Sequence, residues 1–183
     1  MGDADDALKT VRARIRTVPD FPKPGISYKD ITPLIEDGAA LHAATDALHR
    51  ATAHLGYELI LSAEARGFVF GTALAYRSKK GLLLARKPNK LPRETVSATY
   101  DLEYGTDTLE AHTDSIGAGA RVLVCDDLLA TGGTARAMCE LVENAGGTVV
   151  GVAFLIELAY LKGRARLAPY EVISLVTYAT PDD

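Results

Sequence analysis

Apolar runs of strand length recur along the chain and alternate with helical patterns. The strands that these runs predict cover residues 58–63, 81–87, 121–127, 148–158 and 171–178. Helical spacing of apolar residues predicts helices over 38–55, 67–79 and about 132–145. Near-continuous apolar strands separated by helices are typical of a parallel sheet that is covered on both faces. The pattern therefore predicts an α/β fold with a five-stranded parallel core sheet flanked by helices.

Two segments before the first strand have other patterns. Residues 4–16 place apolar side chains three and four positions apart, which predicts a short amphipathic helix. The stretch 19–33, PDFPKPGISYKDITP, holds prolines that exclude regular structure, and we expect Pro33 to interrupt the chain once more. A flexible linker would not need its aromatic and aliphatic residues, so we expect a shaped segment and not a tether.

A third segment, residues 93–114, alternates polar and apolar residues around Gly105. This alternation predicts an exposed β-hairpin. A hairpin that stands away from a doubly wound sheet is a candidate flap over a binding site.

The length and charge of the chain limit its class. A chain of 183 residues suits a single domain, residues 1–183. Its 48% of hydrophobic and 24% of charged residues are those of a globular protein and exclude disorder. The formal net charge of −4 argues against general binding to nucleic acid or to a membrane surface. A polyanionic ligand must therefore be held by local groups.

The cysteines and the termini favour a cytoplasmic protein. Cys125 and Cys139 lie in apolar surroundings without partners at metal-ligand spacing, so we expect two reduced core cysteines. No apolar run approaches the roughly 20 residues of a membrane span. The acidic start MGDADD is neither a secretory signal nor a transit peptide.

The most informative segment is VLVCDDLLATGGTARAM, residues 122–138. An apolar strand ends in Asp126 and Asp127, and a short glycine-containing loop then leads into a helix. Unpartnered N–H groups at a helix N-terminus bind an anion, and carboxylates accept hydrogen bonds from vicinal hydroxyls. A ribose 5-phosphate would fit both the carboxylates and the loop. The alternative interpretation of the segment is a purely structural one, an Asp-capped strand end followed by a glycine turn into a helix. The residues expected at the phosphate are Ala130, Thr131, Gly132, Gly133 and Thr134.

Two further segments offer positive charge. EARGF, residues 64–68, also follows a strand and precedes a helix, and the guanidinium of Arg66 suits a diphosphate. The alternative for Arg66 is a surface arginine at the start of a helix. RKPNKLPR, residues 86–93, leads from a strand into the candidate flap, and is either a solvated face or a basic path beside the site.

Five segments together resemble the type I phosphoribosyltransferases, and within them the branch that acts on adenine. They are FPKPGISYKDITP, EARGFVFG, RKPNKLPRET, YDLEYGTDTLE and VCDDLLATGGT. DDLLATGGT is the motif of the whole superfamily, and the proline-rich segment and the LEYG hairpin narrow it to the branch. The resemblance runs from about Val18 to Lys162. It implies a type I phosphoribosyltransferase-like fold with a small N-terminal hood, about residues 18–36, and a flexible flap, about 93–114.

The resemblance also implies a reaction. The 5-phosphoribosyl group of 5-phosphoribosyl 1-diphosphate would pass to N9 of adenine, giving AMP and diphosphate in purine salvage. Mg²⁺ would be the cofactor, bound mainly through the diphosphate, and the protein would be a homodimer.

The resemblance assigns roles to residues outside the phosphate loop. Arg66, Lys87 and Lys90 would bind the diphosphate. Glu103 matches the proposed catalytic glutamate, and Tyr104 would cover the reacting centre. The Arg66 loop would also carry a non-proline cis peptide bond, between residues 64 and 65.

By the same resemblance the base pocket is FPKPGISYKD. Ser27 and Lys29 would offer main-chain hydrogen bonds to adenine, and Tyr28 would stack on it. Relatives often carry a hydrophobic residue and arginine where this chain has Ser27 and Lys29, so selectivity for a 6-aminopurine is in doubt only if side chains read the base. Leu158 would close the far wall, or is a plain core leucine.

Two rival functions stay open at this point. A non-catalytic sensor with the same sugar-diphosphate site would need a DNA-binding extension or a basic face, and the segment before the hood is too short for one. An enzyme of the same chemistry acting on hypoxanthine, guanine or orotate is the nearer rival. His42, His49 and His54 share one predicted helix without other metal ligands, and we interpret them as surface residues.

Overall fold

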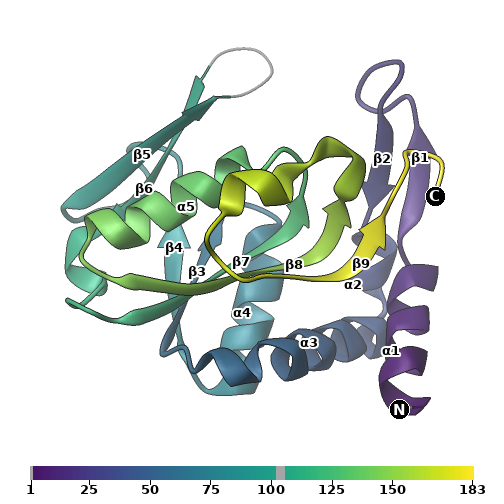
Figure 1. Cartoon of the computed structure of the whole chain (residues 1–183), viewed down its shortest axis with the longest axis horizontal. Coiled ribbons are helices and arrows are strands. Elements are labelled where there is room, and N and C mark those ends of the chain that lie inside the picture. Colours follow the sequence, from purple (N-terminus) through teal and green to yellow (C-terminus); the bar gives the residue numbers. More distant parts are fainter. Residues whose placement is uncertain (1, 102–105) are drawn as a thin grey trace.

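The computed structural model describes residues 2–101 and 106–183 (Figure 1). Five parallel strands form the core sheet in the order β4-β3-β7-β8-β9, which confirms the predicted five-stranded parallel sheet. The strands are β3 (Leu59–Ala63), β4 (Gly81–Ala85), β7 (Arg121–Leu129), β8 (Thr148–Leu158) and β9 (Val172–Tyr178).

Helices cover both faces of this sheet. They are α3 (Gly38–Thr52), α4 (Gly67–Ser78) and α5 (Gly133–Asn144). Figure 1 shows α3 and α4 on one side of the sheet and α5 on the other. Because side chains alternate along a strand, Leu123 and Cys125 of β7 pack toward α3 and α4, while Val122 and Val124 pack toward α5. Cys125 and Cys139 are both buried and free, as predicted.

The hood contains more regular structure than its prolines suggest. β1 (Arg16–Pro19) and β2 (Ser27–Asp30) pair antiparallel, and α2 (Thr32–Glu36) follows. The prediction that this stretch excludes regular structure was wrong. Pro22 and Pro24 lie in the turn between the strands, where a missing N–H breaks no ladder bond. Pro33 lies in the first turn of α2, after Thr32, instead of interrupting the chain, because an N–H in the first turn of a helix has no partner to lose.

The flap is an antiparallel hairpin, as predicted. β5 (Thr95–Asp101) pairs with β6 (Thr106–His112), and the hairpin stands away from the core at the upper left of Figure 1. Ala98 and Leu109 attach its inner face to the α5 side of the core. The predicted turn at Gly105 lies outside the described residues.

The remaining elements connect these layers. They are α1 (Gly2–Ala13), η1 (Ala53–Leu55), η2 (Thr113–Ser115), η3 (Ala159–Leu161) and η4 (Gly163–Leu167). α1 ends three residues before the predicted end at 16, because Arg16 already belongs to β1. None of the helices in the described ranges has both the length and the hydropathy that crossing a membrane requires.

Candidate active site

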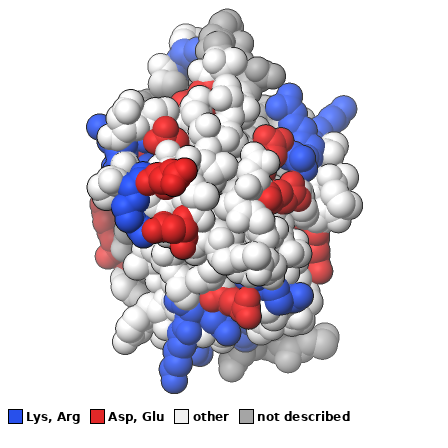
Figure 2. Space-filling view, turned by 90° about the vertical axis from the view of Figure 1, so that its left-hand side faces the viewer, with Lys and Arg blue, Asp and Glu red and all other residues white. Residues whose placement is uncertain are grey.

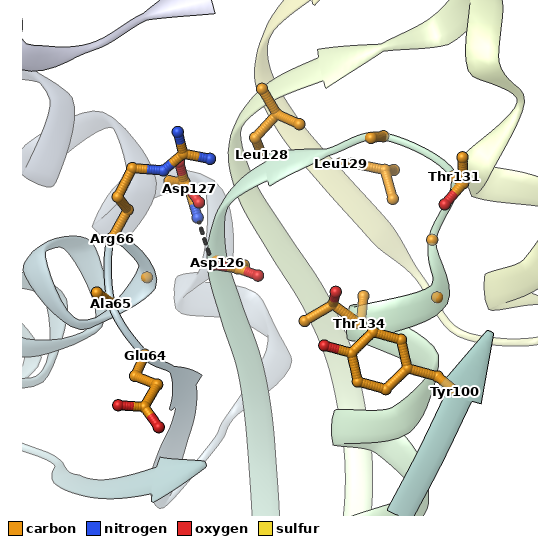
Figure 3. A pocket seen from close by; sticks show the side chains of 15 residues that line it. Glu64, Ala65, Arg66, Tyr100, Asp126, Asp127, Leu128, Leu129, Thr131 and Thr134 are labelled. Carbon is orange, nitrogen blue, oxygen red and sulfur yellow. Dashed lines mark hydrogen bonds and ion pairs between the residues drawn. The ribbon is translucent and has the colours of Figure 1, made fainter. Parts of the chain in front are cut away.

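A cavity of about 460 Å³ opens at the carboxyl ends of β3 and β7. Its walls are residues 64–67, residues 126–135 and Tyr100 of the flap. Because β3 and β7 are neighbours in a parallel sheet, the loops that follow them meet at one edge. Figure 3 shows Arg66 on one side of this cavity and Thr131 and Thr134 on the other. The two predicted anion-binding loops therefore face each other across one site.

Asp126 and Asp127 lie inside β7 and not at its end, which corrects the predicted strand boundary. The pairing of β7 with β3 stops at Cys125, whereas its pairing with β8 continues to Leu129. The strand therefore continues two residues beyond the carboxylates, supported from one side only. The absence of β3 on the other side leaves both carboxylates at the cavity.

Burial dominates the electrostatics of this carboxylate pair. The exposed fractions of Asp126 and Asp127 are 8% and 6%. Burial raises the pKa of Asp126 well above its usual range, and the neighbouring charge of Asp127 adds to the rise. Burial also raises the pKa of Asp127, against the opposing effect of Arg66, whose Nε lies 2.7 Å from Asp127 Oδ2. The site thus keeps two almost dry carboxylates where hydroxyl groups of a ligand can reach them.

The Arg66 loop approaches this pair so closely that only glycine fits beside it. A Cβ atom at Gly67 would overlap Oδ1 of Asp126. The peptide bond between Glu64 and Ala65 is cis, as the family resemblance implies. The Glu64 carboxylate accepts hydrogen bonds from the Lys87 backbone N–H at 2.5 Å and from Arg86 Nη2 at 3.1 Å. These bonds tie the loop after β3 to the end of β4.

The phosphate loop has the geometry of an anion cradle. Gly132 has a φ of 84°, in the left-handed region, and α5 begins directly after it at Gly133. A Cβ atom at Gly132 would lie 2.6 Å from the carbonyl oxygen of Gly163, and a Cβ atom at Gly163 would overlap the carbonyl of Ala130. Gly163 therefore supports the loop from behind. Sequence reasoning missed it, because a lone glycine after a strand carries no pattern that points to the loop.

Tyr100 of β5 is a second residue that sequence reasoning missed. Its hydroxyl donates to Asp107 Oδ2 at 3.1 Å and lies beside Thr134 of the phosphate loop (Figure 3). Burial raises the pKa of Tyr100, so the phenol stays protonated and remains a donor at neutral pH. The sequence did contain a signal for Tyr100, because the alternation along the flap strand separates the side chains that face the site from those that face solvent.

The hood reaches the cavity through Tyr28. Its hydroxyl accepts a hydrogen bond from Arg66 Nη1, and its ring packs edge-on against Phe21 with ring centroids 5.0 Å apart. A smaller cavity of about 340 Å³ lies at this corner. Its lining residues are Val18, Phe21, Tyr28, Asp30 and Thr32. The guanidinium of Arg66 thus joins the hood to the Asp127 carboxylate.

Comparison with known proteins now gives the family. The model of the phosphoribosyl transferase domain matches residues 39–179. The adenine phosphoribosyltransferase of Rubrobacter xylanophilus is 65% identical over 182 residues, 99% of this chain and 98% of that protein. This chain belongs to the adenine phosphoribosyltransferase family. It is accordingly a transferase of pentosyl groups.

Solved structures of the family agree with the architecture. The adenine phosphoribosyltransferase of Thermoanaerobacter pseudethanolicus superposes with a TM-score of 0.91 at 49% identity, covering 93% of this chain and 99% of that one. The Saccharomyces cerevisiae enzyme, complexed with D-2,5-dideoxy-2,5-imino-altritol 1,6-bisphosphate and adenine, superposes with a TM-score of 0.88 at 35% identity. The match covers 93% of this chain and 99% of that one. The predicted type I phosphoribosyltransferase fold is confirmed.

Five residues that the family resemblance selected lie apart from the main cavity. Ser27 and Lys29 turn their side chains toward residues 181–183. Leu158 is buried at the end of β8. The Lys87 ammonium pairs with Asp107 of the flap, whereas Lys90 lines a separate cavity of about 390 Å³ beside β4. Glu103 and Tyr104 lie outside the described residues.

His42 of α3 and His54 of η1 are exposed and contact carboxylates, whereas His49 of α3 is half-buried and its Nδ1 has no hydrogen-bond partner. His42 Nε2 lies 3.5 Å from Asp46, and His54 Nε2 lies 3.0 Å from Glu171. Across residues 2–101 and 106–183, no group of three or more His, Cys, Asp or Glu side chains is placed to hold a metal ion.

Proposed function

We propose that this chain transfers the 5-phosphoribosyl group of 5-phosphoribosyl 1-diphosphate to N9 of adenine and releases AMP and diphosphate for purine salvage. One observation carries the proposal: the dry carboxylate pair Asp126 and Asp127 lies between a helix N-terminal loop and the Arg66 guanidinium in a single cavity. A sugar that bears a phosphate at one end and a diphosphate at the other matches this order of groups. The names of the relatives support adenine as the acceptor.

Within this proposal each wall of the cavity binds one part of the sugar. Residues 130–134 receive the 5-phosphate through backbone N–H groups and the hydroxyls of Thr131 and Thr134. Asp126 and Asp127 accept hydrogen bonds from the ribose hydroxyls. Fixing the sugar at both ends holds its anomeric carbon toward the base and lowers the entropic part of the barrier.

The diphosphate leaves the anomeric carbon as positive charge develops on the ribose ring. Arg66 and the lysines Lys87 and Lys90 would stabilise the departing anion. Burial is the largest single influence on the pKa of Lys87 and lowers it, but the hydrogen bond and charge of Asp107 and the contact with Tyr100 together leave the pKa raised. Lys87 therefore stays cationic at neutral pH, and the diphosphate would compete with Asp107 for it.

Mg²⁺ fits this site as an ion that arrives on the substrate. It prefers oxygen ligands and retains several waters, so one or two carboxylates suffice beside phosphate oxygens. Asp126 and Asp127 would be the carboxylates beside the sugar, and the described part of the chain has no group of three or more His, Cys, Asp or Glu side chains that could hold a metal ion without the substrate. The ion would neutralise charge on the leaving diphosphate.

The base would enter from the hood. The main-chain groups of Ser27 and Lys29 in β2 would read the edge of adenine, and the ring of Tyr28 would stack on it. Leu158, at the end of β8, would close the opposite wall. Because the side chains of Ser27 and Lys29 are engaged elsewhere, their difference from relatives is expected to leave adenine selectivity unchanged.

Purified protein with Mg²⁺ and 5-phosphoribosyl 1-diphosphate tests the acceptor. Adenine, hypoxanthine, guanine and orotate are supplied in turn, and nucleotide formation is followed by chromatography. We expect AMP from adenine and little product from the other bases. Formation of nucleotide from hypoxanthine but not from adenine would reject adenine as the acceptor. Absence of nucleotide with every base would favour the non-catalytic sensor.

Glu103→Gln tests the flap glutamate. We expect kcat to fall by at least about 10²-fold, the effect of removing one preorganised group that stabilises charge in the transition state. Steady-state kinetics with adenine measure it. Glu94→Gln, at the foot of the same hairpin and exposed, is the matched control and should keep near-normal turnover. Turnover by Glu103→Gln at the level of that control would exclude the role.

We also propose that the protein is a cytoplasmic homodimer. The edge strand β4 exposes 40% of Leu84, a large apolar side chain on an unpaired edge. On the flap side of the molecule, uncharged residues occupy a central strip with charged residues at its flanks (Figure 2). A second copy could cover such a surface, and light scattering of the purified protein measures the mass that decides it.

A further inference from the structure

The hood strand β2 has two faces with different tasks. Side chains of a strand alternate, so Tyr28 and Asp30 share one face and Ser27 and Lys29 the other. Tyr28 and Asp30 line the small hood cavity, and Tyr28 contacts Arg66. The face that bears Ser27 and Lys29 is turned to the segment Ala179–Asp183, which we call the tail strap. Figure 1 shows this end of the chain beside β1.

Lys29 is a buried cation whose partners come mostly from the tail strap. Its exposed fraction is 2%. Its ammonium donates to the Asp183 carbonyl at 2.6 Å, the Pro181 carbonyl at 3.3 Å and Thr17 Oγ1 at 3.0 Å. It also lies 4.3 Å from the centre of the Tyr178 ring. A buried ammonium is stable only while such partners satisfy it, so Lys29 and the strap depend on each other.

Two further contacts hold the strap in this place. Ser27 Oγ donates to the Pro181 carbonyl at 2.7 Å. The Asp183 carboxylate accepts hydrogen bonds from the N–H groups of Ala179 and Thr180 at 2.6 and 2.9 Å, which closes the strap into a turn. The strap is therefore a folded turn whose carbonyls face β2, continuous with the last core strand β9.

We propose that Lys29 is a positioning residue and that, through it, the tail strap fixes β2 at the distance from the sheet that adenine binding requires. The inference rests on the proposed function, because it takes the main chain of β2 as the base-binding edge. Lys29 itself does not touch the base. Its ammonium anchors the back of the strand whose front carries Tyr28.

Two variants remove the anchor from opposite sides. Lys29→Met keeps the apolar stem but cannot donate, and deletion of residues 181–183 removes the two acceptor carbonyls. We expect either change to raise KM for adenine about 10-fold, the effect of losing a charge-assisted hydrogen bond that orders the site. KM for 5-phosphoribosyl 1-diphosphate and kcat should stay within about twofold, because the residues expected at the ribose and its 5-phosphate, 126–134, lie on β7, α5 and the loop between them.

The combination of the variants distinguishes an anchor from general damage. If Lys29 acts through the strap, the double variant has the same KM for adenine as either single one. Lys29→Arg, which keeps the charge and the donors, should restore most of the affinity. Lys80→Met, an exposed lysine far from the hood, is the matched control and should change nothing.

Amide hydrogen exchange tests the same anchor without relying on turnover. Faster exchange of residues 27–30 in both variants, with β8 unchanged, supports the proposal. The proposal is overturned if KM for adenine and exchange of β2 are unaffected, if the effects of the two changes multiply, or if both KM values and kcat change together. Absence of AMP formation by the unmodified protein would instead reject the proposed function, and hydrogen exchange would still decide whether the strap holds β2.

Discussion

Replacing both cavity carboxylates, Asp126→Asn with Asp127→Asn, is expected to lower kcat/KM for 5-phosphoribosyl 1-diphosphate by about 10³-fold. The amides keep the size of the side chains but lose the negative charge. Each charge-assisted hydrogen bond to a ribose hydroxyl is worth about 1.5–3 kcal/mol, and two are lost. The charge that faces the developing positive charge on the ribose is lost as well. Steady-state kinetics at varied sugar substrate measure the change.

The same variant should be at least as stable as the parent protein at neutral pH. Burial holds the pKa of both carboxyl groups above the unfolded values, so the folded state loses stability as pH rises from the unfolded pKa through the folded one. The amides remove this penalty. Arg66 loses the Asp127 partner, but its side chain is 44% exposed and water replaces much of the contact.

Thermal unfolding at pH 4 and pH 8 therefore separates function from structure. The advantage of the double variant in Tm should appear at pH 8 and shrink at pH 4. Asp114→Asn, which changes an exposed carboxylate, serves as the control for both assays. A double variant that unfolds at a lower temperature than the control at pH 8 would contradict the burial penalty, and a kcat/KM equal to that of the control would overturn the assignment to the ribose.

Gly132→Ala should also reduce kcat/KM by about 10³-fold, with the effect concentrated in KM for 5-phosphoribosyl 1-diphosphate. The new methyl group meets the carbonyl of Gly163 at 2.6 Å, and the backbone at φ 84° disfavours any side chain. The loop must move away from Gly163, which breaks the alignment of its N–H groups with the 5-phosphate. Loss of two phosphate hydrogen bonds gives about the stated factor.

Gly119→Ala is a close control for this change. Gly119 has a φ of 74°, similar to that of Gly132, but a Cβ atom there meets nothing within 4 Å. Both variants therefore have the same kind of backbone strain, and only Gly132→Ala has the clash. If Gly119→Ala lowers stability slightly while activity persists, the large loss in Gly132→Ala belongs to the loop. Equal activity of the two variants would contradict the role of the Gly132–Gly163 contact.

The core of the fold could be predicted from the sequence because its signals are local. Each parallel strand buried on both faces is a continuous apolar run, and the predicted bounds of β8 match the observed ones. The end of β7 was harder, since Asp126 and Asp127 interrupt the apolar run while pairing with β8 continues. The end of a strand depends on where its neighbours in the sheet end, and the residues of that strand alone do not determine this.

The site could be predicted in its loops and not in its supports. The loop residues could be recognised because charged residues and glycines directly follow an apolar run, as Asp126, Asp127 and Arg66 do. Gly163 and Lys29 could not be recognised, because what they contact lies far away in the sequence: Lys29 meets a carbonyl 154 residues later. β1 and β2 were missed for a related reason, as strands of four residues among prolines carry too little alternation to be recognised.

That separation of 154 residues between Lys29 and Asp183 also bears on how the chain is made. The hood leaves the ribosome early, whereas the carbonyls that satisfy Lys29 are synthesised after the whole core sheet. Until then the lysine must stay hydrated and β2 cannot settle. A chain that lacks residues 181–183 is therefore expected to form its sugar-phosphate cavity while β2, the base-binding edge, stays without its anchor.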